Sequence, residues 1–366
     1  MNIVISRGNL LSALQQVIGV VERRQSLPIL GNVFLRVSDD QLELRTTDLE
    51  IQIGCAVQVQ NLAPGSVTAP ARKLYDICRG LPEGSEIELQ EQEGRLRVKS
   101  GRSRYVLATL PAADFPELEQ IEGQATFEMP SAVLKSLIVR TQFAMAQQDV
   151  RYYLNGLLLE VADKTMRAVA TDGHRLAVSE EAVECTSEAG GQYIVPRKTV
   201  LEVARLLDVQ DATVKLGLAA GQLVMRVNDC TLVSKLVDGS YPEYKRVIPE
   251  NGDHCAVANR EAVKQALTRA AILSNEKFRG VRVGLASGVM KIETQNPDQE
   301  EAFEEVSIAY EGEDLTIGFN VTYLLDALNA MNGEEFALEM RGPDASGLIY
   351  DEKIPQHKYV VMPMRL

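Results

Sequence analysis

The sequence predicts an α+β fold made of three similar repeats of about 120 residues each. Two landmarks return at the same offset of 126 residues: DFPEL at Asp114–Leu118 returns as SYPEY at Ser240–Tyr244, and Pro70 returns as Pro196. Landmarks that recur at one offset and in one order are typical of internal repeats. We therefore expect three domains, which cover residues 1–124, 125–252 and 253–366.

A Thr-Asp pair marks the middle of each repeat. Thr47-Asp48 returns as Thr171-Asp172 after 124 residues, and Thr294–Asn296 occupies the same place in a fainter third copy. Chance similarity between β-rich domains is the alternative to a repeat. The shared offsets and the shared order favour the repeat.

Helical and strand-like patterns alternate in each repeat. Each repeat opens with apolar residues at helical spacing, at Leu10–Leu14, Leu134–Ile138 and Val263–Leu267. A strand-like apolar stretch follows, at Asn32–Val37, Gly156–Val161 and Gly280–Leu285. A second helix is expected at about Arg72–Leu81, Lys198–Leu207 and Thr322–Ala330. Alternation at period two predicts further strands, at Glu86–Leu89, Arg95–Lys99 and Arg104–Leu110.

The composition is that of a folded globular protein, with 45% hydrophobic and 24% charged residues in a chain of 366. No apolar run approaches the roughly 18 to 20 residues that cross a bilayer. The segment Met1–Leu10 lacks the apolar stretch and cleavage site of a signal peptide. We therefore expect a cytoplasmic protein that does not enter a membrane.

The cysteines and histidines argue against a disulfide framework and against a metal site. The five cysteines are odd in number, scattered and without a CxxC motif, which favours reduced thiols in a cytosol. They are Cys55, Cys78, Cys185, Cys230 and Cys255. No two of the three histidines lie at the spacing of a ligand pair. We expect no metal and no cofactor.

The net charge of −13 argues against a nucleic-acid partner, because phosphate binding requires a positive field. The objection fails only if the basic residues are gathered on one surface. On two of the expected second helices, basic residues recur seven positions apart, as Arg72 and Arg79 and as Lys198 and Arg205. A solvated helix face is the alternative for a single helix. Because the spacing of basic residues recurs on two helices, we favour a basic surface that binds the phosphates of a duplex without sequence preference.

Ten blocks spread over the whole chain carry a resemblance to a known family. They are LPILGNV (Leu27–Val33), TDLE (Thr47–Glu50), PARKLYDICRGLPEG (Pro70–Gly84), SGRSRYVLATLPAADFP (Ser100–Pro116), QDVRYYLNG (Gln148–Gly156), ATDGHRLAV (Ala170–Val178), VPRK (Val195–Lys198), SKLVDGSYPEYKRVIP (Ser234–Pro249), AILSNEKFRGVR (Ala271–Arg282) and YVVMPMRL (Tyr359–Leu366). In this order they resemble the bacterial β sliding clamps, the β subunits of the DNA polymerase III holoenzyme.

The resemblance implies three DNA-clamp domains per chain and a homodimeric, head-to-tail ring of six domains. Helices would line the hole around double-stranded DNA, and antiparallel sheets would form the outer wall. Basic helices that face inward would reconcile the acidic net charge with DNA binding. The ring would act without catalysis, as a tether that raises the concentration of polymerase at the primer end.

The resemblance also implies DNA-contacting residues and a groove for peptides. The DNA-contacting residues would be Arg24, Arg72, Gln148, Tyr152, Tyr153, Lys198 and Arg205. Ordinary packing is the alternative for one of the two tyrosines. The groove would accept short clamp-binding peptides of the polymerase III catalytic subunit, the clamp loader, other DNA polymerases, and mismatch repair and ligase proteins. Its residues would be Leu154, Thr171, Gly173, His174, Arg175, Leu176, Pro242, Arg246, Val247, Ser346, Val360, Met362, Pro363, Met364, Arg365 and Leu366.

Ring closure would need two complementary ends. The first repeat offers a basic and apolar set, namely Lys73, Lys99, Arg102, Arg104, Tyr105 and Leu107. The third repeat offers an apolar and acidic set, namely Ile272, Leu273, Glu300, Glu301, Glu304 and Glu305. Opposite ends of this kind suit a heterologous interface that closes after two copies.

Two alternatives remain open from the sequence. An enzyme would have to use Asp172, His174 and Arg175, but no nucleophile elbow and no phosphate-binding glycine loop accompanies them. We therefore expect no catalytic residues. A repeat-built scaffold that binds proteins and never meets DNA is the second alternative, and the repeated basic helix face argues against it.

Overall fold

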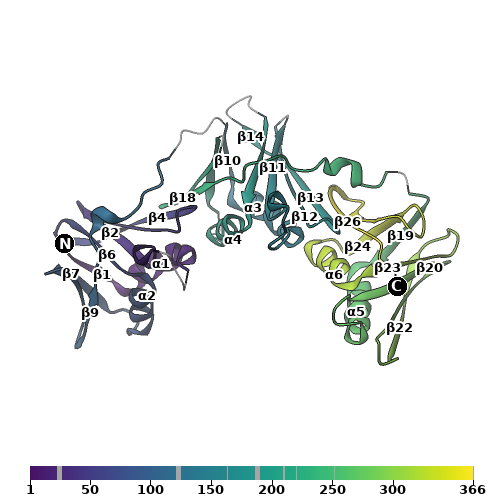
Figure 1. Ribbon diagram of the computed structural model, residues 1–366, viewed down its shortest axis with the longest axis horizontal. Helices are drawn as coiled ribbons and strands as arrows, with labels where there is room; N and C mark the ends of the chain where they lie inside the picture. Colours follow the sequence, from purple (N-terminus) through teal and green to yellow (C-terminus); the bar gives the residue numbers. More distant parts are fainter. Residues whose placement is uncertain are drawn as a thin grey trace. The chain divides into compact units, whose positions relative to one another are not determined.

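The computed structural model describes residues 1–22, 27–120, 125–162, 164–185, 190–208, 211–219, 221–250 and 252–365 (Figure 1). Its contacts divide the chain into two compact units. The first compact unit comprises Met1–Leu134, Glu184–Ala189 and Leu201–Leu236. The second comprises Lys135–Val183, Gly190–Val200 and Val237–Leu366.

Within the described residues, the first compact unit contains two antiparallel sheets. The five-stranded sheet consists, in spatial order, of β5 (Gln60–Ala63), β1 (Asn2–Ser6), β7 (Glu86–Gln92), β8 (Arg95–Ser100) and β9 (Ser103–Ala108). The nine-stranded sheet consists, in spatial order, of β14 (Glu184–Cys185), β10 (Ala125–Pro130), β16 (Thr213–Ala219), β17 (Gln222–Val227), β18 (Cys230–Lys235), β4 (Ile51–Gln58), β3 (Gln41–Thr47), β2 (Asn32–Ser38) and β6 (Gly65–Pro70).

The second compact unit contains one antiparallel sheet of twelve strands among the residues described. In spatial order they are β15 (Gly191–Pro196), β11 (Gly156–Ala162), β12 (Thr165–Thr171), β13 (Arg175–Ala182), β26 (Ile354–Val361), β25 (Gly347–Asp351), β24 (Glu335–Met340), β19 (His254–Asn259), β22 (Glu301–Ala309), β21 (Val289–Gln295), β20 (Gly280–Ala286) and β23 (Leu315–Asn320).

Every α-helix of the described residues begins directly after a strand. The helices are α1 (Arg7–Val17), α2 (Ala71–Gly80), α3 (Ser131–Val139), α4 (Arg197–Leu206), α5 (Arg260–Ala270) and α6 (Val321–Ala330). Short 3₁₀ segments accompany them: η1 (Ile18–Val20), η2 (Pro28–Gly31), η3 (Ala112–Asp114), η4 (Gln142–Ala144), η5 (Tyr152–Leu154), η6 (Tyr244–Val247) and η7 (Ala271–Leu273). Each predicted helix and strand overlaps one of these elements, although the predicted strand Arg104–Leu110 extends beyond β9, which ends at Ala108. The predicted α+β class is confirmed.

Polar side chains start three of these helices. The side chains of Ser6, Asn259 and Asn320 accept hydrogen bonds from backbone N–H groups in the first turns of α1, α5 and α6. Such caps satisfy donors that have no partner inside the helix. Each helix buries a stripe of apolar side chains at spacings of three and four residues, such as Leu10, Leu14 and Val17 in α1. The opposite face is left for charged residues.

The repeated Thr-Asp pair builds the same turn twice. The Asp48 carboxylate accepts backbone N–H bonds from Glu50 and Ile51 at 2.9 and 2.8 Å. The Asp172 carboxylate accepts the equivalent bonds from residues 174 and 175 at 2.9 and 3.1 Å. Because aspartate readily bonds the backbone two residues ahead, it suits such a turn. The Thr-Asp pair is thus explained by turn geometry.

Two strand ladders join different repeats, and we call them the seams. In the first compact unit, β18 of the second repeat pairs with β4 of the first, with Leu232 opposite Ile53. In the second compact unit, β26 of the third repeat pairs with β13 of the second, with Val360 opposite Leu176. Each seam turns the sheets of two repeats into one continuous sheet.

The expectation of reduced thiols is wrong for one pair of cysteines. Cys55 in β4 and Cys230 in β18 form a disulfide across the first seam. The sequence could not reveal this pair, because the two cysteines are 175 residues apart and meet only through the pairing of two repeats. Cys78 is free and buried, and Cys255 is free and exposed. The side chain of Cys185 lies outside the described residues.

Candidate functional site

The loop that follows η4 and runs into η5 contains three of the residues that were expected to contact DNA. The Asp149 carboxylate accepts bonds from the backbone N–H and the guanidinium of Arg151, and the Asn155 amide donates to the Asp149 carbonyl at 2.9 Å. Gln148, at a positive φ of 56°, is exposed at the start of this loop. The guanidinium of Arg151 holds the pKa of Asp149 low, at about 2.

The two tyrosines of this loop have different environments. Tyr152 is 57% exposed, whereas Tyr153 is half-buried and packs against the core of the second compact unit. Their rings meet edge to face, with centroids 5.8 Å apart. Tyr152 is therefore available to a ligand. Much of the Tyr153 side chain is used in packing within the chain, which was the alternative to DNA contact.

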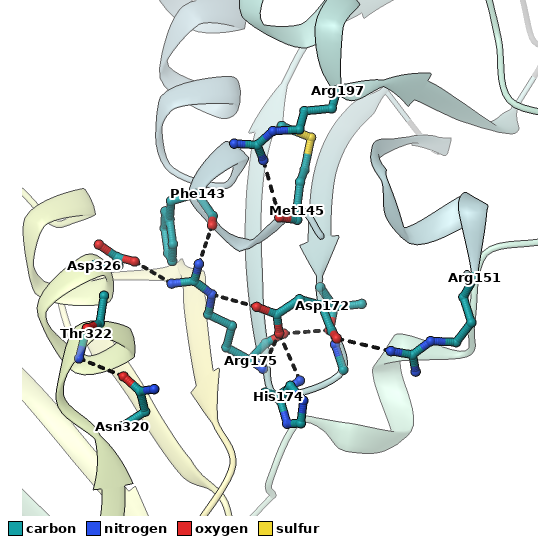
Figure 2. A network of polar contacts seen from close by, with 12 residues as sticks. Phe143, Met145, Arg151, Asp172, His174, Arg175, Arg197, Asn320, Thr322 and Asp326 are labelled. Carbon is teal, nitrogen blue, oxygen red and sulfur yellow. Dashed lines mark hydrogen bonds and ion pairs between the residues drawn. The ribbon is translucent and has the colours of Figure 1, made fainter. Parts of the chain in front are cut away.

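Arg175 is held from several sides at the start of β13. Its guanidinium donates to Asp172 at 3.1 Å, to the Phe143 carbonyl at 2.6 Å and to Asp326 of α6 (Figure 2). It also lies over the Tyr323 ring, 4.4 Å from the ring centroid. With these partners, Arg175 ties the second repeat to the third across the second seam.

Two buried tyrosines fix the segment that carries Pro242, Arg246 and Val247. The Tyr241 hydroxyl accepts a bond from the Thr171 N–H at 3.0 Å, and Tyr241 is 7% exposed. The Tyr244 hydroxyl donates to Glu160 at 2.6 Å, and Tyr244 is 4% exposed. Pro242, Arg246 and Val247, which alternate with these anchors, are exposed.

The carboxylate of Glu160 is the centre of a charged network under this segment. Arg167 bonds Glu160 and Glu180, and it donates to the Tyr244 hydroxyl at 3.2 Å. Burial alone would raise the pKa of Glu160. Hydrogen bonds from Tyr244, Gln192 and Arg167 outweigh burial and lower this pKa to about 2. Burial and the bond to Glu160 raise the pKa of Tyr244, so its hydroxyl stays a donor.

Three of the expected groove residues belong to one core cluster, and the other members have different environments. Leu154, Leu176 and Val360 are 2 to 3% exposed and belong to this core together with Tyr241 and Tyr244. They are buried and offer almost no surface to a ligand. Thr171 and Gly173 form the Thr-Asp turn, and Ser346 is half-buried. The exposed members among the described residues are His174, Pro242, Arg246, Val247, Met362 and Arg365.

The end of the chain is divided between two places. The Met362 N–H donates to the His174 carbonyl at 2.9 Å, which keeps Met362 beside the Thr-Asp turn. The Met364 N–H donates to the Gly318 carbonyl of β23 at 2.7 Å. Met364 and Arg365 line a separate cavity with Phe278. Pro363 is half-buried between the two places, and Leu366 lies outside the described residues.

The basic residues of the helices are partly engaged within the chain. The Arg205 guanidinium donates to the carbonyls of Gln15 and Gln16 at 2.7 and 2.5 Å, and it thereby caps the end of α1. The Arg72 guanidinium bonds the Val21 carbonyl. Both side chains remain exposed, and Lys198 is half-buried in the first turn of α4. Arg24 lies outside the described residues.

No group of three or more potential metal ligands is found among the described residues. A helix long and apolar enough to cross a membrane is likewise missing from the part of the chain that is described.

Comparison with known proteins decides the family. Models for the N-terminal, central and C-terminal domains of the DNA polymerase III beta subunit match residues 1–119, 128–243 and 245–365. The chain is 50% identical to a beta sliding clamp of Pseudomonas putida and 48% identical to that of Escherichia coli K12, with 100% of each chain covered.

Solved structures agree with this match. The DNA polymerase III subunit beta of Pseudomonas aeruginosa superposes with a TM-score of 0.97 at 49% identity, and 100% of both chains is covered. A sliding clamp of Caulobacter crescentus gives a TM-score of 0.93 at 36% identity, again over 100% of both chains.

The chain belongs to the family of bacterial β sliding clamps.

This membership sets both alternatives from the sequence aside. A sliding clamp is a processivity factor of DNA replication without catalytic activity, so the scaffold that never meets DNA is excluded. Asp172 and Arg175 of the supposed catalytic cluster are also explained by the turn and by the seam. The three repeats are clamp domains of helices and antiparallel sheets, as the resemblance implied.

Some residues of the clamp's candidate site carried no signal in the sequence. Glu160 and Arg167 occupy ordinary alternating strand positions, and only the fold brings them to Tyr244. Tyr323 and Asp326 lie 151 positions or so from Arg175, on a helix of another repeat. Phe278 was quoted within a sequence block, but its 54% exposure beside Met364 emerges only from the fold.

The lowered pKa of Glu160 predicts a pH-dependent contribution to stability. Because the pKa in the folded state is about 2 and the ordinary value is 4.5, the contribution is complete above about pH 4.5 and is lost as the pH falls toward 2. Glu160→Gln removes the ionisable group. Denaturant unfolding should therefore show a wild-type advantage at pH 6 that shrinks by pH 3. An advantage of equal size at both pH values would contradict this role of Glu160.

Proposed function

We propose that two copies of this sliding clamp close head to tail into a ring around duplex DNA. The ring would hold DNA polymerase and other replication proteins through short peptides. The single observation that carries the proposal is a pair of incompletely paired sheet edges with exposed apolar residues and opposite charge. The three domains of each copy are proposed to cover residues 1–124, 125–252 and 253–366.

The first edge is β9, which ends the five-stranded sheet. Tyr105 is 39% exposed and Val106 is 57% exposed on this strand. Arg102 and Arg104 are exposed beside them, and exposed Lys73 lies on α2. Leu107 was expected at the interface, but it is 8% exposed and already packs within its own unit. An unpaired edge with apolar side chains is a template for another strand.

The second edge is the first part of β22. Among the described strands, its residues Glu301–Ser307 pair with β21 alone, and only Ile308 and Ala309 pair with β19. Phe303 is 57% exposed on this strand, and Ile272 in η7 is 77% exposed. Glu300, Glu301 and Glu305 are exposed along the same edge. Leu273 is half-buried, and Glu304 already pairs with Arg269 at 2.6 Å.

The β9 edge of one copy is complementary to the β22 edge of another copy, whereas neither edge is complementary to itself. Like charges would oppose a contact between two β9 edges or between two β22 edges. Contact of β9 with β22 of another copy brings Arg102 and Arg104 toward glutamates. A heterologous contact of this kind closes when two copies satisfy each other at both ends. The apolar side chains would supply most of the affinity, and the ions would set the register.

Contact with DNA is proposed to be weak and diffuse. Gln148 and Tyr152 are exposed on the loop that runs into η5. Arg72 on α2 and Arg205 on α4 are exposed, although each also bonds a backbone carbonyl at or after the end of α1. Lys198 completes the described set, Tyr153 supports it from the core, and Arg24 is proposed from the resemblance alone. Bonds to phosphates without base reading permit sliding, and their strength falls with salt.

The peptide groove is proposed around the second seam. Val247 is 44% exposed and Met362 is 38% exposed, over a core that Tyr241 and Tyr244 fix in place. Flexible methionine suits a surface that accepts several ligands. The polymerase III catalytic subunit, the clamp loader, other polymerases, mismatch repair proteins and ligase are proposed to use it. Sliding clamps act in bacterial DNA replication, and we place this chain in the cytoplasm on that basis.

The edge-to-edge contact predicts a specific loss of dimer. Val106→Ala and Phe303→Ala should each raise the dimer dissociation constant about tenfold, because each shortens an exposed apolar side chain at the contact. Sedimentation velocity over a range of concentrations measures the change. Leu62→Ala is the matched control, since Leu62 is 52% exposed on β5 at the opposite edge of the same sheet. An equal shift in the control, or no shift in either variant, would refute the placement.

The groove predicts a separate phenotype. Val247→Ala and Met362→Ala should each weaken the binding of a clamp-binding peptide of the polymerase about tenfold, through lost apolar contact. Fluorescence anisotropy with a labelled peptide measures the affinity, and sedimentation checks that the dimer persists. Val150→Ala serves as the control, because Val150 is 95% exposed on the loop outside the groove. Unchanged peptide affinity in both groove variants would contradict the assignment.

A further inference from the structure

The disulfide lies at the point where the first and second repeats are joined. Cys55 and Cys230 are opposite each other in the antiparallel ladder of β4 and β18, with Cα atoms 4.2 Å apart. The adjacent Ala56 N–H donates to the Asp229 carbonyl at 3.1 Å, so the cysteines occupy a non-hydrogen-bonded site. Opposite side chains come closest at such sites. The backbone pairing alone therefore brings the two sulfur atoms together.

The surroundings also accommodate the reduced form. The side-chain oxygen of Gln16, on α1, lies within hydrogen-bonding reach of the Cys230 sulfur. In the reduced protein, the Cys230 thiol can donate to this oxygen. Cys55 and Cys230 are 3% and 4% exposed, and apolar Leu44 and Val227 lie opposite them on the other flanking strands, β3 and β17. When the disulfide is reduced, the buried Cys230 thiol therefore has a hydrogen-bond acceptor.

A small reagent can reach the pair from one side. Cys230 lines a cavity together with Asn9, Ser12, Gln16 and Asp229. These side chains are polar, so the cavity admits water and small polar molecules. Cys78, in contrast, is fully buried in α2, and burial raises the pKa of its thiol to about 12. The chain thus contains an inert thiol as an internal reference.

We propose that Cys55 and Cys230 are a reversible thiol–disulfide pair that fastens the first seam under oxidising conditions and releases it under reducing ones. This inference goes beyond the proposed function and does not depend on it. A second contact between the same two repeats is independent of redox state, because Arg205 of α4 bonds the end of α1. The reduced seam would therefore stay folded but become less stable.

The oxidation balances with hydrogen peroxide as the oxidant. The Cys230 thiolate attacks one peroxide oxygen, the O–O bond breaks, and the departing hydroxide takes up a proton to leave as water. The Cys55 thiol then attacks the sulfur of the resulting sulfenic acid. The S–O bond breaks, the S–S bond forms, and a second water leaves. Two thiols and one peroxide thus yield one disulfide and two waters. A dithiol reductant reverses the outcome by thiol–disulfide exchange.

The test identifies which cysteines are joined in a disulfide. The full-length protein is reduced with dithiothreitol, freed of the reductant, and divided into a portion treated with hydrogen peroxide and an untreated portion. Free thiols are alkylated under denaturing conditions with a light reagent, and thiols released by later reduction are alkylated with a heavy reagent. Mass spectrometry should find the heavy label on Cys55 and Cys230 together, only after peroxide. Cys78 should carry the light label in both portions.

Thermal unfolding measures how much the disulfide stabilises the protein. The oxidised protein should unfold at least about 5 °C above the reduced protein, because the cross-link closes a long loop. Cys55→Ala/Cys230→Ala should lose the difference, and Cys78→Ala should keep it. Cys55→Ser and Cys230→Ser singly provide folded alternatives if the double variant is unstable, with circular dichroism as the check on folding.

Several outcomes would overturn the proposal. Light label on Cys55 and Cys230 after peroxide treatment of the folded protein would show that the pair does not oxidise. Heavy label on other cysteines, or covalent dimers on a non-reducing gel, would show a different pairing. A disulfide that forms without changing the unfolding temperature would refute the fastening of the seam.

Discussion

Strand pairing between repeats is the constraint on which the rest of the molecule depends. Each repeat has sheet edges that must be paired or protected. Within the chain, β18 pairs with β4, and β26 pairs with β13, so the junctions between repeats are both covered. Among the edges left without a partner strand in the described residues are β9 in the first repeat and the first part of β22 in the third. The proposed dimer follows from these remaining edges, because a second copy offers the partner that each edge lacks.

The same pairing explains why the candidate groove lies at the second seam. The ladder of β13 and β26 brings the Thr-Asp turn of the second repeat beside the end of the third, where the Met362 N–H bonds the His174 carbonyl. Arg175 secures the junction through Asp326, and the buried tyrosines secure the last segment of the second repeat. A surface built from several elements of two repeats needs such fixed supports. Exposed side chains can then be selected for ligand binding without loss of the fold.

The sequence predicted the elements well, because helices and strands here depend on local apolar spacing. The repeat also emerged, since Thr47-Asp48 and Thr171-Asp172 build identical turns for local reasons. The sequence did not predict the contacts between repeats that are distant in the chain. Nothing near Cys55 points to Cys230, and nothing near Arg205 indicates that it caps α1. Burial was equally hidden: Tyr152 and Tyr153 are neighbours of one type, yet only Tyr152 is largely exposed.

The claim that the clamp encircles DNA is tested most directly by retention on DNA of different topology. The protein is loaded onto nicked circular plasmid with a compatible clamp loader and ATP, and half the sample is linearised with a restriction enzyme. Both halves are passed through a sizing column at moderate salt, which weakens ordinary phosphate contacts. A closed ring predicts that the protein stays with the circle and is lost from the linear DNA, where it slides off the ends. Equal retention on both forms would show simple electrostatic binding and would contradict the ring.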